Sequence, residues 1–160
     1  TGLLSVRIKT ANFGCRSNLS NAGDLLSSLR LFVIISEDYP NFSILPVQAF
    51  SDPLQNPLPI NWLGAWFNAD VDQSIFQGHV LSLPVLNIVV EDYNDGRVFT
   101  LCRLIRARFN YAKELRISGN FLIEQMGIFK NCGVDSFALP DDADYDYALF
   151  ILKNTPVPCI

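Results

Sequence analysis

Two glycine-containing turns and a set of arginines are the residues of this sequence whose types and spacing could bind a small anion. Asp95, Gly96 and Arg97 form a turn at the start of an expected helix, and Thr100 follows one helical turn later. The unpaired N–H groups of a helix N-terminus, together with a guanidinium group, bind small oxyanions. Arg97 opposes the helix dipole, which favours acids at this end. The alternative is that Asp95 only caps the helix and that Arg97 is solvated.

Arg116 is the second candidate, because it falls in the middle of a strand that should be covered on both faces. An unpaired charge there would be very costly, so the arginine needs a partner. Glu91, Asp92 and Asp135, on the flanking strands, are the expected partners, and a structural ion pair and an anion-binding role are both open. The predicted site for a small anion lies between the two turns, with Arg116 reaching up from its strand, and comprises Asp95, Gly96, Arg97, Thr100, Arg103, Arg116, Gly119 and Asn120.

Two classes of function are compatible with these residues, and the first of them is also implied by a family resemblance described below. A non-catalytic accessory or small-anion-binding protein needs only the binding groups. An enzyme acting on a small oxyanion or sulfur compound would use Arg97, Arg103 and Arg116 for binding and Asp95 or Asp92 as the acid–base group. The sequence has no glycine-rich nucleotide loop, no zinc-protease motif and no nucleophile elbow, so no catalytic residue is assigned.

The cysteines and the histidine do not form a metal-binding pattern. Cys15, Cys102, Cys132 and Cys159 are scattered singly, and the chain has one histidine, His79. Cys102 and Cys132 fall on the apolar stripes of expected helices, where a small core side chain is the simplest role. We therefore expect no metal and no cofactor of the protein's own.

The elements that would position these residues are strands and helices in alternation. Leu86–Val90, Glu114–Ser118 and Asp135–Leu139 are expected strands. An apolar stripe after Gly96 predicts the first helix between them, and a second helix is expected to begin at Gly119-Asn120. Short connections of this kind imply right-handed parallel crossovers, with any ligand at the carboxyl ends of the strands. The second helix's expected stripe is Phe121, Leu122, Gln125, Ile128, Phe129 and Cys132.

The fold class is therefore α/β, a single domain with a parallel β-sheet core and flanking helices. Residues 1–58 are expected to be an irregular N-terminal part with edge strands, and residues 59–153 the core of βα repeats. The Trp62 and Trp66 side chains are expected in the core. The remaining expected elements are strands at Leu4–Lys9, Leu31–Ile35, Ile44–Phe50 and Ile60–Phe67, and helices at Asp24–Arg30, Asp70–Val80 and Asp141–Lys153.

The composition of the chain limits the kinds of partner and location that we expect. The net charge of −4 argues against nucleic-acid binding, which needs a basic face. No apolar run approaches membrane-spanning length, so a cytoplasmic location is expected. Charged residues are only 18% of the chain, and polar Gln125 interrupts an apolar stripe, where it must find hydrogen-bond partners. We expect a structural bond from Gln125 to a neighbouring helix or subunit. These features favour a homodimer.

The second half of the chain resembles a known family. The motif residues are Asp95-Gly96-Arg97, Phe99-Thr100, Arg103-Leu104, Arg106, Glu114-Leu115-Arg116, Gly119, Gln125, Cys132-Gly133 and Asp135. Together they resemble the bacterial domain-of-unknown-function family DUF934. Asn120 stands where that family usually has aspartate, and Ile123 where it usually has arginine. The resemblance implies a gene beside that of the sulfite reductase haemoprotein, a role in sulfur assimilation, and the label of an oxidoreductase that members often carry.

Overall fold

The computed structural model describes residues 9–13, 30–36, 43–50, 63–140 and 142–156 of the chain. Within these ranges the protein forms a seven-stranded sheet in the order β1-β2-β7-β6-β5-β4-β3. β1 pairs antiparallel with β2, and every other pair of neighbours is parallel. The strands are β1 Lys9–Phe13, β2 Arg30–Ser36, β3 Ser43–Pro46, β4 Leu63–Phe67, β5 Val85–Val90, β6 Glu114–Gly119 and β7 Ser136–Leu139.

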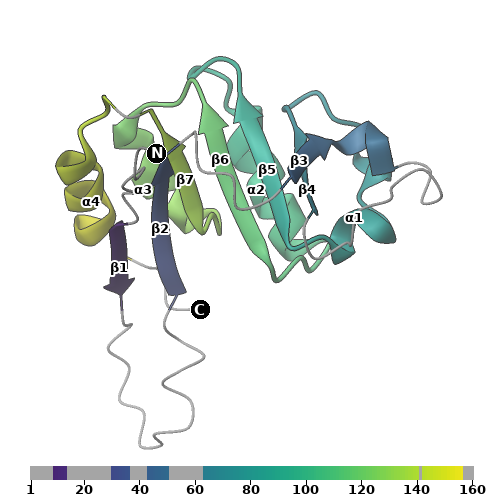
Figure 1. Ribbon diagram of the computed structural model, residues 1–160, viewed down its shortest axis with the longest axis horizontal. Coiled ribbons are helices and arrows are strands. Elements are labelled where there is room, and N and C mark those ends of the chain that lie inside the picture. The colour runs from purple at the N-terminus through teal and green to yellow at the C-terminus, as the bar shows by residue number, and fades with distance from the viewer. Residues whose placement is uncertain (1–8, 14–29, 37–42, 51–62, 141, 157–160) are drawn as a thin grey trace, which may run out of the picture.

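From β3 to β7 each strand lies beside the preceding one, always on the same side. With right-handed crossovers, this direction of travel places successive helices on one face of the sheet. Figure 1 shows α2 and α3 together behind the sheet. The helices are α1 His79–Ser82, α2 Arg97–Ala107, α3 Met126–Asn131 and α4 Tyr145–Asn154, with 3-10 turns η1 Val47–Phe50, η4 Gln73–Ile75 and η5 Ile123–Gln125.

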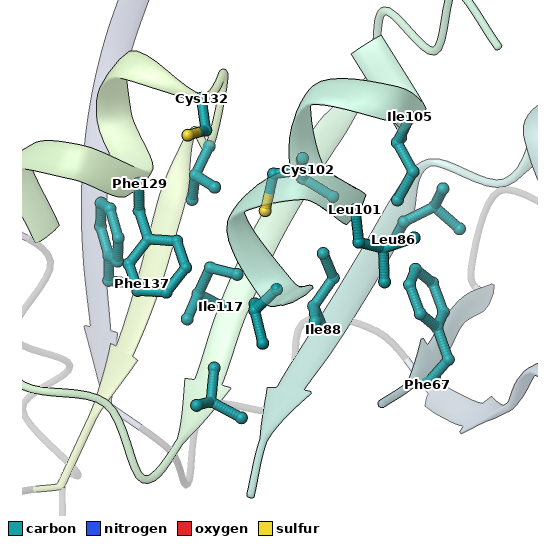
Figure 2. Packing of buried hydrophobic residues seen from close by; sticks show 14 of the residues in the cluster. Phe67, Leu86, Ile88, Leu101, Cys102, Ile105, Ile117, Phe129, Cys132 and Phe137 are labelled. Carbon is teal, nitrogen blue, oxygen red and sulfur yellow. The ribbon is translucent and has the colours of Figure 1, made fainter. Parts of the chain in front are cut away.

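The core lies between the sheet and these helices. Leu86 and Ile88 of β5 and Ile117 of β6 are fully buried, and they face Leu101 and Ile105 of α2 (Figure 2). Burying each such side chain contributes about 1.5–3 kcal/mol. This layer holds the strand ends, and therefore the two turns, in fixed positions.

The parallel β-α-β-α-β arrangement expected for Leu86–Leu139 is confirmed, as are the strand around Leu31–Ile35 and the last helix. The strand expected over Ile44–Phe50 is β3 followed by a 3-10 turn, at the edge of the sheet. Most of the helix expected at Asp24–Arg30 and most of the strand expected at Leu4–Lys9 lie outside the described residues; Arg30 itself is the first residue of β2.

The helix expected from Gly119-Asn120 begins later than predicted. Gly119 has a φ of +94°, and the Asn120 N–H donates to the Val90 carbonyl at 2.7 Å. The chain therefore remains hydrogen-bonded to β5 at this point and does not yet enter a helix. Helical structure starts with η5, and α3 begins at Met126. The predicted apolar stripe was wrong at two of its positions, because Leu122 is 43% exposed and Ile128 is 52% exposed.

Two further expectations were wrong. The helix expected over Asp70–Val80 is replaced by η4 and the short α1, because the Asp72 side chain caps the Ser74 N–H and Gly78 has a φ of +57° between them. Trp66 was expected in the core but is 38% exposed. It follows the alternation of β4, which turns Phe67 towards the helices and Trp66 away from them. Trp62 lies outside the described residues.

Candidate functional site

The turn before α2 is held by Asp95. Its Oδ1 accepts the Arg97 backbone N–H at 3.0 Å, which satisfies one of the unpaired N–H groups of the helix N-terminus. The same carboxylate binds the Arg97 guanidinium, with Nε at 2.9 Å and Nη2 at 2.8 Å. Arg97 Nη1 donates to Asp70 Oδ1 at 2.6 Å. All three guanidinium nitrogens are therefore bound to carboxylates of the same chain, while 64% of the Arg97 side-chain surface stays exposed.

The surface at the carboxyl ends of β4 and β5 is acidic. Asp70, Glu91 and Asp92 are exposed and Asp95 is partly exposed, against the single positive charge of Arg97. The hydrogen bonds from Arg97 lower the pKa of the Asp95 carboxyl, and the two carboxylates raise the pKa of Arg97. We name these five residues, at the carboxyl ends of β4 and β5, the acidic rim.

The lowered pKa of Asp95 predicts a pH dependence of stability. Since the folded pKa lies below the unfolded value, the pairing contributes fully above about pH 4 and is lost as pH falls through the folded pKa. Asp95→Asn should therefore make the acid-side loss of unfolding free energy shallower, measured by urea denaturation across a pH series. Arg97→Gln removes the main cause of the shift and should flatten the curve in the same direction. An Asp95→Asn curve parallel to that of the wild type would contradict this account.

The second turn lies beside the first, because Val90 and Gly119 are register partners. Besides the backbone bond to Val90, Asn120 Nδ2 donates to the Glu91 carbonyl at 3.1 Å. These bonds tie the turn to β5. The helix N-terminus expected beside it is absent from the described chain at this point, since three-residue η5 comes first. Thr100 and Arg103 are exposed on α2.

Gln125 has a different role from the one expected. Its Oε1 accepts from the Leu122 N–H at 3.0 Å, and its Nε2 donates to the Tyr93 carbonyl at 2.8 Å. The side chain thus joins the start of η5 to the loop after β5. The expectation of a bond to another helix or subunit was wrong, and Gln125 gives no support to a dimer.

Arg116 is buried, with 5% of its surface exposed, and its partner is Glu114. Glu114 Oε1 accepts from Arg116 Nε at 3.2 Å and Nη2 at 2.8 Å. The expected partners Glu91, Asp92 and Asp135 were wrong, because residues two apart in a strand share a face and the flanking acids do not lie on that face beside Arg116. Arg116 therefore pairs within β6 and away from the two turns.

Arg116 belongs to a row of side chains on the second face of the sheet, the face opposite α2 and α3. Trp66, Asn87, Arg116 and Ser136 are successive register partners across β4, β5, β6 and β7. Their sequence neighbours Phe67, Ile88, Ile117 and Phe137 face the helices, as the labelled side chains in Figure 2 show. We name these four residues, with Glu114 and Ser118 from the same face of β6, the polar row.

Hydrogen bonds join several side chains of the polar row. Ser136 Oγ donates to Glu114 Oε1 at 2.6 Å, and Asn87 Nδ2 donates to Ser118 Oγ at 3.0 Å. Asn87 is 6% exposed, and its Oδ1 has no hydrogen-bond partner among the described residues. A buried acceptor left unpaired costs about 1–3 kcal/mol. The alternating polar residues of β6, Glu114, Arg116 and Ser118, could have revealed this face from the sequence, but Leu86–Val90 was interpreted as apolar on both faces.

A second arginine, whose side chain is only 14% exposed, was also missed. Arg106 donates to the carbonyls of Gly133 at 2.8 Å, Tyr111 at 2.6 Å and Lys113 at 2.7 Å, and it forms an ion pair with Asp135. It joins the end of α2 to the segments that lead into β6 and β7. Its place beside Ile105, at the border of the apolar stripe, was the available signal.

The two described cysteines are core side chains, as expected. Cys102 is fully buried and Cys132 is 3% exposed, and burial raises the pKa of the Cys102 thiol. We predict that iodoacetamide leaves both unlabelled in the native protein and labels both in guanidinium chloride, as read by peptide mass spectrometry. Rapid native labelling of Cys102 would contradict the buried position. Cys15 and Cys159 lie outside the described residues.

Within the described ranges, no group of three or more His, Cys, Asp or Glu side chains could hold a metal ion. His79 is exposed on α1. In the same part of the chain, no helix is long and apolar enough to cross a membrane.

No curated protein matches the chain in sequence. The family model described as a bacterial protein of unknown function, DUF934, matches residues 64–157, which include the acidic rim, both turns and the whole polar row. The chain therefore belongs to the DUF934 family of bacterial proteins.

Proposed function

We propose that the protein is a non-catalytic accessory protein of sulfite reduction, which binds the sulfite reductase haemoprotein in the cytoplasm. The link to sulfite reduction is supported by the resemblance to a family encoded beside that haemoprotein. The absence of catalysis is supported by the way the charged groups at the strand ends are bound to one another.

The observation that carries the proposal is the pairing of Arg97 with Asp95 and Asp70. The Arg97 guanidinium already donates to two carboxylates, at 2.8 and 2.6 Å, and these carboxylates offset its charge and would repel an anionic substrate. An acid–base catalyst would instead need a carboxyl whose pKa is raised towards neutrality. The pKa of Asp95 is lowered, so the carboxylate is a weak base. This arrangement favours a rigid, charged surface over an enzyme acting on a small oxyanion or sulfur compound.

The acidic rim is the surface that we assign to the partner. Tyr93, 48% exposed, lies among its carboxylates and offers an aromatic contact of the kind enriched at interfaces. A patch of one charge binds and steers a complementary basic surface. The haemoprotein should therefore bind through a basic patch, and the affinity should fall with added salt.

Calorimetric titration of the purified haemoprotein with this protein tests the proposal. The double variant Glu91→Gln/Asp92→Asn keeps the shapes of the two side chains and removes two charges, and it should weaken binding by about fivefold. Arg108→Gln is the control, at the opposite end of α2, where it raises the overall negative charge without touching the rim. Equal affinities for wild type and double variant, or no binding at all, would discard the proposal. Heat from millimolar sulfite alone would favour the anion-binding alternative.

We further propose that the protein acts as a homodimer. The supporting observation is the outer side of α4, where Phe150 is 58% exposed and stacks on Tyr147, itself 38% exposed. A second copy of the chain would remove these rings from water, and the burial of their apolar surface would stabilise the dimer. Light scattering should give twice the monomer mass for the wild type and a smaller mass for Phe150→Lys. A monomer mass for the wild type at micromolar concentration would rule out the dimer.

A further inference from the structure

We propose that the Asp95-Gly96 peptide is a site of spontaneous isoaspartate formation, and that the Arg97 side chain restrains this reaction. The modified chain would be a substrate for a protein isoaspartyl methyltransferase, the class of enzyme that repairs such peptides. The proposal concerns the chemistry of one turn of this protein. Its test needs no partner, so its failure and the failure of the proposed function are distinguishable.

The reaction needs only the peptide and water. The Gly96 backbone nitrogen attacks the carboxyl carbon of protonated Asp95, a C–N bond forms, and the carboxyl OH leaves with the N–H proton as one water molecule. The product is a five-membered succinimide ring, which a water molecule then opens at either carbonyl. Opening at the side-chain carbonyl restores aspartate. Opening at the main-chain carbonyl gives isoaspartate, in which the main chain runs through Cβ and Cγ.

The first observation is the open approach to the Gly96 nitrogen. Gly96 is exposed, and a Cβ atom built on it would meet nothing within 4 Å. No hydrogen bond from its N–H to a described residue is formed. A side chain on the residue after an aspartate hinders the attack, whereas glycine leaves the nitrogen uncovered. The attacking nitrogen is therefore accessible and is not held by another acceptor of the described chain.

The second observation is the conformation of the Asp95 side chain. Its Oδ1 accepts the backbone N–H of Arg97, two residues further along the chain, at 3.0 Å. A side chain in this conformation folds back along the intervening peptide, whose nitrogen is that of Gly96. Two reacting groups that the chain holds close together react far more readily than separate molecules do. The turn therefore keeps the carboxyl group beside the nitrogen that would attack it.

The third observation is the restraint by Arg97. A carboxylate does not react until it is protonated, because its oxygen leaves as water. The Arg97 guanidinium donates to Asp95 from Nε at 2.9 Å and from Nη2 at 2.8 Å, and these bonds, with that from the Arg97 backbone, lower the pKa of the carboxyl. The other charged groups of the acidic rim are Asp70, Glu91 and Asp92, and they do not outweigh this effect. At a given pH, less of the Asp95 carboxyl is protonated and able to react.

The test follows isoaspartate in the folded wild type, Gly96→Ala and Arg97→Gln during long incubation across a series of mildly acidic to neutral pH values. Peptide mass spectrometry with electron-transfer fragmentation locates the modified residue, and methyl transfer by a purified protein isoaspartyl methyltransferase measures its amount. We expect isoaspartate at Asp95 in the wild type and at least about twofold more in Arg97→Gln, whose rate should also fall off at a higher pH. Gly96→Ala should form much less, because its methyl group hinders the attack.

Asp72 is the matched control within the same chain. It is exposed, its Oδ1 accepts the Ser74 N–H at 2.9 Å in the same two-residue bond, and its pKa is also lowered. Because Gln73 follows it, Asp72 should form no detectable isoaspartate. Equal amounts at Asp72 and Asp95, none at Asp95 in either wild type or Arg97→Gln, or equal rates in these two proteins would each overturn the proposal. If Arg97→Gln does not stay folded, the comparisons of wild type with Gly96→Ala and of Asp95 with Asp72 still decide.

Discussion

Replacing Arg106 with methionine is expected to lower the free energy of unfolding by about 3–5 kcal/mol, the usual cost of removing one partner from a buried ion pair. The side chains of Arg106 and Asp135 are only 14% and 23% exposed, so water screens the pair weakly. The change removes the ion pair between Arg106 and the Asp135 carboxylate. It also leaves the carbonyls of Gly133, Tyr111 and Lys113 without their common donor. Equilibrium denaturation in urea, followed by circular dichroism, measures the loss.

The matched control is Arg103→Met, on the same helix and one turn earlier. Arg103 is exposed, and it forms no ion pair with any described residue. Its replacement should change the free energy of unfolding by no more than about 0.5 kcal/mol. Equal effects of the two substitutions would show that Arg106 does not join α2 to the sheet as the geometry indicates.

Asp135 shows why the sequence could predict the fold better than the ion pairs. The strands and their parallel order follow from runs of β-branched residues and short connections, which are local properties. The partner of Asp135 depends on which long side chain at the end of α2 reaches back to β7. Periodicity places Arg106 only at the border of the buried stripe of α2, and it does not say how far the guanidinium extends.

The candidate anion site shows the same limit. Both turns were predicted to lie side by side, and the register of Val90 with Gly119 places them so. What the sequence could not predict is that Asp70, 27 residues before Arg97, folds over to bind it. Asp70 lies in a segment whose apolar pattern favoured a helix, whereas Asp72 and Gly78 end the helical hydrogen bonding there. Whether Arg97 can bind an anion therefore depends on its tertiary contact with Asp70, which no local sequence pattern indicates.

The polar row was missed for a different reason. A short strand with one asparagine was interpreted as a strand buried among apolar side chains, and Asn87 was given no weight. In the structure all the helices between β5 and β7 lie on one face, so the residues of β6 alternate between an apolar layer and a polar one, and Asn87 of β5 lies beside the polar one. The signal was present in the alternation Glu114, Arg116, Ser118, which has the period of a strand with two unlike faces.

Gly119→Ala is expected to destabilise the protein by about 2–4 kcal/mol, although it adds only one methyl group. Gly119 has a φ of +94°, a conformation that is strained for any residue with a Cβ. A Cβ atom would also clash with the Val90 carbonyl oxygen and lie 3.1 Å from the Val90 nitrogen, so the backbone of β5 would have to move. That movement would break the bond from the Asn120 N–H to Val90, which sets the position of the turn.

Gly96→Ala is the matched control, because it adds the same methyl group at the other turn. Gly96 has a φ of −66°, and a Cβ there would meet nothing within 4 Å. The expected change is within about 0.5 kcal/mol, since the alanine enters an allowed helical conformation without a clash. Thermal and urea unfolding of the two variants together isolate the effect of backbone conformation from that of the added methyl group. If both alanines were tolerated equally, the tight connection between β6 and the end of β5 would have to be abandoned, and with it the fixed spacing of the two turns.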